Sequence, residues 1–133
     1  MVQALIIEDD VFYASLFERQ IKNYNCLQTI TWESSPFPLW SGANFDLILI
    51  SDSLLENAML GQLFHLKMKH PKTPIVVFTQ NQNKDIVEQY IKMGAQMVIF
   101  KNRYCLSKLS DFIYKCIKIN SKKRAINILP LTK

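Results

Sequence analysis

Short hydrophobic runs alternate along the chain with longer segments in which apolar residues recur every three or four positions. The short runs have the length and composition of buried strands, and the longer segments have the period of an amphipathic helix. Such alternation is typical of βαβ units, in which helices cover both faces of a parallel sheet. Five strands are predicted, at residues 2–7, 27–32, 45–50, 75–78 and 97–100.

Helices are predicted between and after these strands. The first begins after Asp10, a residue suited to cap a helix N-terminus, and Gly94 is suited to end a later one. The segment 34–44 contains Pro36, Pro38 and Gly42, so its helix should be short, distorted or partly absent. The remaining helices are predicted at residues 55–68, 86–93 and 106–117.

The length of 133 residues fits one domain, here residues 1–120, with 121–133 as a basic C-terminal tail or the start of a linker. The hydrophobic runs are much shorter than the roughly 20 residues that cross a bilayer, so no membrane span is expected. Residues 1–7 carry no basic leader and run directly into acids, which predicts a cytoplasmic protein. Three cysteines without a CxxC pair do not indicate a zinc site.

The net charge of +5 is unevenly distributed. Residues 101–133 hold nine Lys or Arg against the single acid Asp111, a charge of +8, whereas residues 1–100 have a charge of −3. Clustered cations can bind nucleic acid or an anionic membrane surface. Because no aromatic residue interleaves the basic tail, a solvated helix end is the preferred interpretation, and direct nucleic-acid binding is not expected.

Polar residues follow four of the five strands, at the edge where the carboxyl ends of parallel strands meet and where such sheets bind ligands. Each has an ordinary structural explanation by itself, since acids complement a helix dipole and a hydroxyl can bond to backbone. Their joint spacing favours a shared site. The residues are Glu8, Asp9 and Asp10 after the first strand, Ser51 and Asp52 after the third, Thr79 after the fourth and Lys101 after the fifth.

This arrangement resembles the receiver domain of bacterial response regulators (CheY-like) over residues 1–120. The resemblance implies a flavodoxin-like three-layer (βα)5 sandwich with a five-stranded parallel sheet of order 2-1-3-4-5. Receivers hold Mg²⁺ with two acids after strand one, accept a phosphoryl group on an aspartate at the end of strand three, and place a hydroxyl and a lysine after the last two strands. Glu8, Asp9, Thr79 and Lys101 match this pattern.

The phosphoacceptor position of the family falls on Ser51, five residues after Asp46. A serine hydroxyl is not ionised near neutral pH, so it forms no acyl phosphate and is a poor metal ligand. Asp52 is the alternative acceptor, and the third metal ligand beside Glu8 and Asp9, if a longer strand or a bulge turns it into the pocket. Mg²⁺ binding is therefore expected to be weak or absent.

Three further departures indicate a degenerate receiver. Gln80, Val98 and Asn102 stand where the family usually keeps a small residue, an aromatic switch residue and a proline. A large side chain at position 80 would narrow access to the phosphoacceptor.

The resemblance therefore implies an atypical receiver of two-component phosphorelay signalling that is not an enzyme and binds proteins independently of phosphorylation. Its partner would be a sensor kinase, an effector or a second copy in a homodimer, bound through the face of the fourth helix, fifth strand and last helix. One alternative is a receiver phosphorylated on Asp52 with Mg²⁺. Another is a nucleic-acid or anionic-surface adaptor that acts through the basic C-terminal helix.

Overall fold

The computed structural model describes residues 2–22, 26–32, 44–54 and 59–115. Residues 34–43 of the irregular helix expected at 34–44, the start of the helix expected at 55, and the basic tail lie outside the described residues.

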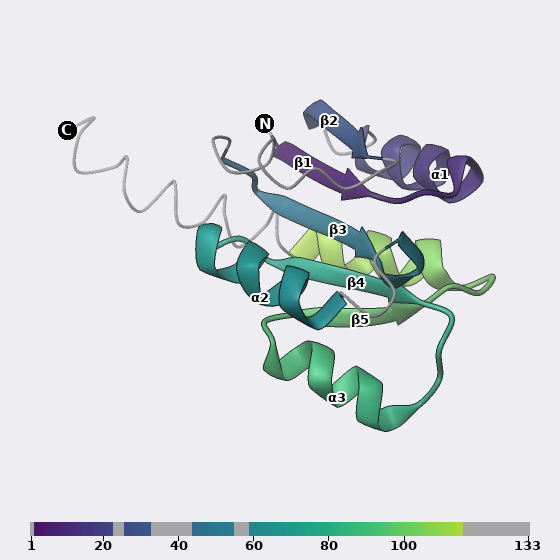
Figure 1. Cartoon of the computed structure of the whole chain (residues 1–133). Coiled ribbons are helices and arrows are strands. Elements are labelled where there is room, and N and C mark those ends of the chain that lie inside the picture. Colours follow the sequence, from purple (N-terminus) through teal and green to yellow (C-terminus); the bar gives the residue numbers. More distant parts are fainter. Residues whose placement is uncertain (1, 23–25, 33–43, 55–58, 116–133) are drawn as a thin grey trace.

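The centre of the molecule is a parallel sheet with the strand order β2-β1-β3-β4-β5 (Figure 1). The α/β class expected from the hydrophobic pattern is confirmed. The third strand begins two residues later than expected and extends to Ser51. The strands are β1 (Val2–Ile7), β2 (Cys26–Trp32), β3 (Leu47–Ser51), β4 (Ile75–Thr79) and β5 (Met97–Phe100).

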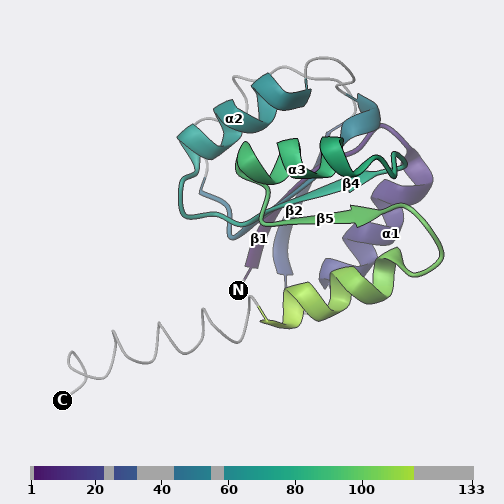
Figure 2. The same ribbon diagram turned by 90° about the horizontal axis from the view of Figure 1, so that it is seen from below.

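Helices cover both faces of this sheet and make three layers (Figure 2). One face, here called the α1 face, carries α1 (Val11–Lys22) and the helix of residues 105–115. The other, the α3 face, carries α2 (Met59–Lys69) and α3 (Lys84–Lys92). A short 3-10 turn, η2 (Asp52–Leu54), follows β3 directly.

Each face has its own hydrophobic core because successive strand residues point to opposite sides. On β1, Leu5 and Ile7 belong to the core of the α3 face, whereas Ala4 and Ile6 belong to that of the α1 face. Burial in these two cores fixes the strand register, since a slip of one residue would move every side chain of a strand to the opposite face, into a core packed around different side chains.

Local capping explains the helix boundaries. The carboxylate of Asp10 accepts the backbone N–H of Phe12 at 2.9 Å, as expected for the N-cap of α1. Helix α3 begins two residues earlier than expected because the Asn83 side chain caps it through the N–H of Asp85. Gly94 ends α3 with a φ of 121°, which confirms the left-handed conformation expected there.

Two glycine substitutions test this packing. A Cβ at Gly94 would lie 2.7 Å from Lys67 Cγ as well as straining the backbone, so Gly94→Ala should lower the free energy of unfolding by roughly 1–3 kcal/mol. Gly61, in α2, has no atom within 4 Å of the added Cβ, so Gly61→Ala should raise it by about 0.5–1 kcal/mol. Urea denaturation measures both changes, and equal effects of the two substitutions would contradict the close approach of the Lys67 side chain to Gly94.

Candidate functional site

The polar side chains at the carboxyl edge of the sheet separate into two groups, one on each face. Leu49 packs in the core of the α1 face and Ile50 in that of the α3 face, so alternation directs Ser51 toward the α1 face. Asp52 opens the turn η2, and its carboxylate accepts hydrogen bonds from Thr79 and Tyr90. The register pairs Ser51 with Phe78, which leaves Thr79 on the same face as Asp52.

The first group is centred on a buried ion pair. Lys101 Nζ lies 2.9 Å from Glu8 Oε1, and the two side chains are only 2% and 1% exposed. The same oxygen accepts the backbone N–H of Asp10 at 3.1 Å. The ammonium also lies 4.8 Å from the centre of the Tyr13 ring, a cation–π contact that covers the pair from α1.

The second carboxylate oxygen of Glu8 is buried and has no hydrogen-bond partner among the residues that the structure describes. Burial raises the pKa of the Glu8 carboxyl above its ordinary value of 4.5. The hydrogen bonds from Lys101 and the Asp10 amide, the charge of Lys101 and the neighbouring Ser51 hydroxyl act to lower this pKa, and burial outweighs them.

Ser51 lies beside this pair and is 1% exposed. Its hydroxyl is 2.9 Å from that of Ser53, and Ser53 in turn donates a hydrogen bond of 3.0 Å to Asp9. Asp9 itself is exposed. Ser51 is thus linked to two of the three acids that follow β1, to Glu8 by proximity and to Asp9 through Ser53.

The second group joins Asp52, Thr79 and Tyr90. Asp52 Oδ2 accepts a hydrogen bond of 2.5 Å from the Thr79 hydroxyl and one of 2.9 Å from the Tyr90 hydroxyl. Burial, followed by the hydrogen bond and the charge of Asp52, raises the pKa of the Tyr90 phenol far above its usual value. Tyr90 therefore stays protonated and acts as a donor.

The two groups divide the residues that the sequence analysis placed in one pocket. Glu8 and Lys101 do come together, but the hydroxyl of Thr79 is bonded to Asp52. Sequence reasoning missed three members of the site: Tyr13, Ser53 and Tyr90. A tyrosine at a core position of a helix usually needs a polar partner, and this was the available signal for Tyr90.

The side chains present do not fit the magnesium site that the resemblance implies. No group of three or more His, Cys, Asp or Glu residues suited to hold a metal occurs in the described part of the chain. Glu8 is paired with Lys101, and Oδ2 of Asp52 accepts hydrogen bonds from Thr79 and Tyr90. A divalent cation prefers several oxygen ligands with negative charge, and Ser51 supplies none.

The three departures from the family pattern have ordinary surroundings. Gln80 is exposed. Val98 packs against the core of the α3 face. Asn102 accepts the backbone N–H of Tyr104 through its side chain, a local turn that leads into the helix of residues 105–115.

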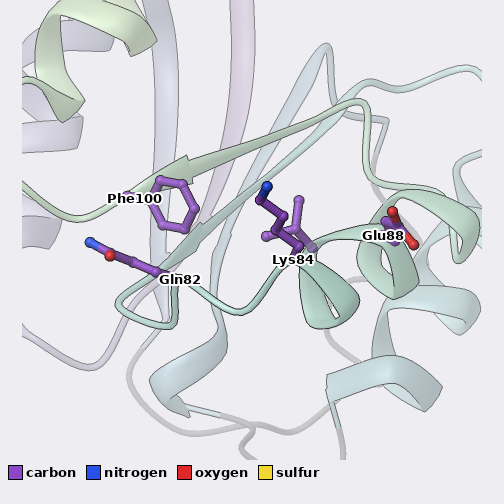
Figure 3. A pocket seen from close by; sticks show the side chains of 5 residues that line it. Gln82, Lys84, Glu88 and Phe100 are labelled. Carbon is purple, nitrogen blue, oxygen red and sulfur yellow. The ribbon is translucent and has the colours of Figure 1, made fainter.

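A groove of about 630 Å³ lies between α3 and β5. We call it the α3–β5 groove. Figure 3 shows Phe100 from β5 near Gln82, with Lys84 and then Glu88 farther along α3. The groove is lined by two apolar side chains, one neutral polar side chain and two side chains of opposite charge. The residues that line it are Gln82, Lys84, Val87, Glu88 and Phe100.

None of the helices in the described part of the chain combines the length and the hydropathy of a membrane-spanning helix.

Comparison with known proteins finds distant relatives by sequence. No family model matches the chain. Among curated proteins, "Regulator of RpoS" from Escherichia coli K12 is 21% identical over 116 residues, which are 86% of this chain and 34% of that protein. The chain therefore spans about a third of the length of this relative.

Solved structures superpose over most of the chain. A response regulator from Thermotoga maritima has a TM-score of 0.76 at 16% identity, over 89% of this chain and 98% of that one. A Burkholderia pseudomallei response regulator solved with a phosphorylated aspartic acid, calcium and citrate has a TM-score of 0.73 at 18% identity, over 96% of this chain and 75% of that one. The chain thus has the fold of response-regulator receiver domains.

The Glu8–Lys101 pair can be tested by removing its charges separately and together. Lys101→Met leaves a buried carboxylate without its cation and should lower the free energy of unfolding at pH 7 by roughly 3–5 kcal/mol. The double variant Glu8→Gln/Lys101→Met buries no charge and should recover most of this loss in urea denaturation.

The pH dependence provides a second check. The folded-state pKa of Glu8 lies above its unfolded value, so ionisation of the buried carboxyl lowers the free energy of unfolding. This loss of stability is absent below about pH 4.5, where Glu8 is protonated in both states, and it grows as the pH rises toward the folded-state pKa. The difference between Lys101→Met and the double variant should therefore shrink on acidification. A difference that stays constant with pH would contradict a charged Glu8 as its cause.

Proposed function

We propose that this chain is an atypical receiver domain of two-component signalling whose output does not depend on phosphorylation. The observation that carries the proposal is the pairing of side chains: the hydroxyl of Ser51 lies on the side of Glu8, and the carboxylate of Asp52 lies with Thr79 and Tyr90. In the family, a carboxylate would stand at the position of Ser51.

This arrangement lacks groups that phosphoryl transfer requires. An aspartyl phosphate needs an ionised carboxylate, and the serine hydroxyl at position 51 offers no such nucleophile. A metal that would shield the incoming phosphoryl group lacks its ligands, since Glu8 is paired with Lys101. The hydroxyl of Thr79 is already donated to Asp52. We therefore propose no enzymatic activity for the domain.

Phosphorylation of Asp52 with Mg²⁺ is the weaker alternative. One oxygen of Asp52 accepts two hydrogen bonds, and a phosphoryl group on that oxygen would have to displace both donors. Action through the basic tail has no support from the described residues, because the tail beyond residue 115 lies outside them.

The α3–β5 groove is the part of the expected interaction face that we propose for partner binding. Val87 and Phe100 provide apolar contact area, and Lys84 and Glu88 provide charges that select a partner. The partner class follows from the resemblance: a sensor kinase, an effector or a second copy of the chain.

Phosphorylation independence can be tested by intact mass spectrometry. After incubation with Mg²⁺ and acetyl phosphate the mass should be unchanged, because no carboxylate is available at position 51. A phosphorylatable receiver treated in parallel must gain about 80 Da, the mass of one phosphoryl group. The same adduct on this protein would overturn the proposal, and its absence from Asp52→Asn would identify the alternative acceptor.

The groove can be tested with two matched substitutions. Val87→Lys places a charge in the groove, and Val11→Lys places the same residue at an exposed position, 66% exposed, at the start of α1. Proteins cross-linked to the wild-type domain in cells should bind Val87→Lys at least about tenfold more weakly, a loss of about 1.4 kcal/mol, and Val11→Lys as well as wild type. Equal binding of both variants would exclude the groove.

A further inference from the structure

We infer that Asp52 is a positioning residue that fixes both ends of α3, and with them the shape of the α3–β5 groove. It does so through two separate connections, one by way of Thr79 and one by way of Tyr90. The inference rests on the proposed function only in that the groove serves for partner binding.

The first connection runs from Asp52 to the start of α3 through a series of side-chain hydrogen bonds. Thr79 donates its only hydroxyl proton to Asp52 and accepts the backbone N–H of Asn81 at 3.0 Å. The Asn81 side chain accepts the N–H of Asn83, and the Asn83 side chain accepts the N–H of Asp85, each at 2.9 Å. Every second residue from 79 to 85 is thereby oriented by the one before it.

The second connection attaches the other half of α3. The Tyr90 hydroxyl donates to Asp52 at 2.9 Å, and the ring is 6% exposed in the core of the α3 face. A hydrogen bond to an ionised carboxylate is shorter and about twice as strong as one between neutral groups. Both hydroxyls use the same oxygen of Asp52, so one carboxylate orients residues from β4 and α3 together.

The groove lies between these two connections. Gln82, Lys84, Val87 and Glu88 fall in sequence after Thr79 and before Tyr90, so both attachments determine where this wall stands. The opposite wall is connected too: Phe100 pairs with Thr79 in the sheet, and the Lys101 N–H donates to the Thr79 carbonyl at 2.9 Å. The groove therefore has its binding shape before any partner arrives, which lowers the entropic cost of binding.

Hydrogen exchange measured by mass spectrometry on the whole chain can separate the two connections. Thr79→Val, which keeps the shape but removes the hydroxyl, should speed exchange about tenfold at residues 81–87 and leave 89–93 nearly unchanged. Tyr90→Phe should speed exchange at residues 89–93 and leave residues 81–87 nearly unchanged. Asp52→Ala should speed exchange in both segments, and Asp52→Asn, which keeps an acceptor oxygen, should restore part of the protection.

Asp9→Ala is the matched control, because it removes an acid at the same edge that contacts Ser53 and not α3. It should leave residues 81–93 unchanged. Faster exchange spread evenly over α1, α3 and the helix of residues 105–115 in all variants would overturn the inference in favour of a general loss of stability. Unchanged exchange at residues 81–93 in Asp52→Ala would overturn it as well. Phosphorylation by acetyl phosphate, which tests the proposed function, has an independent readout.

Discussion

The alternation of side chains along parallel strands in fixed register is the constraint on which the rest of this structure depends. Two hydrophobic cores hold the register, because a slip of one residue would exchange the strand side chains of one core for those of the other. The side chain of each polar residue at a strand end points to the face that the alternation of the preceding apolar residues determines. Ser51 therefore lies with the Glu8–Lys101 pair, and Asp52 lies with Thr79 and Tyr90.

Because Glu8 and Lys101 bond to each other and Asp52 bonds to Thr79 and Tyr90, these side chains form two separate sets of interactions. On the α1 face a cation and an anion neutralise each other out of contact with water, next to hydroxyls. On the α3 face a carboxylate collects two hydroxyl donors and orients a helix. In the first arrangement the Glu8 carboxylate is paired with Lys101, and in the second the Asp52 carboxylate contacts α3 through Tyr90.

Much of the fold could be predicted from the sequence because burial on both faces produces a strong pattern. Strand β1 and strand β5 have the expected bounds, and Asp10 and Gly94 have the expected capping roles. The start of α3 was set two residues too late, since the hydrophobic period does not register a polar cap such as Asn83. Helix ends are governed by single hydrogen bonds, which apolar periodicity does not report.

The site was less predictable. The meeting of Glu8 with Lys101 follows from the strand ends alone, although 93 residues separate them. The hydrogen bond from Thr79 to Asp52, the alternative acceptor, depends on the turn that follows β3, and the strand pattern does not specify that turn. Tyr90 lies 38 residues from Asp52 on a helix, and no strand-end rule brings the two together. That contact depends on how α3 packs, a property of the whole sheet.

The position of the Asp52 carboxylate decides between the two assignments, and a crystal structure of the protein grown with Mg²⁺ would show it. We predict that Asp52 accepts hydrogen bonds from Thr79 and Tyr90, with the Ser51 hydroxyl on the side of Glu8 and Lys101. A metal ion bound jointly by Asp52, Glu8 and Asp9 would contradict this prediction.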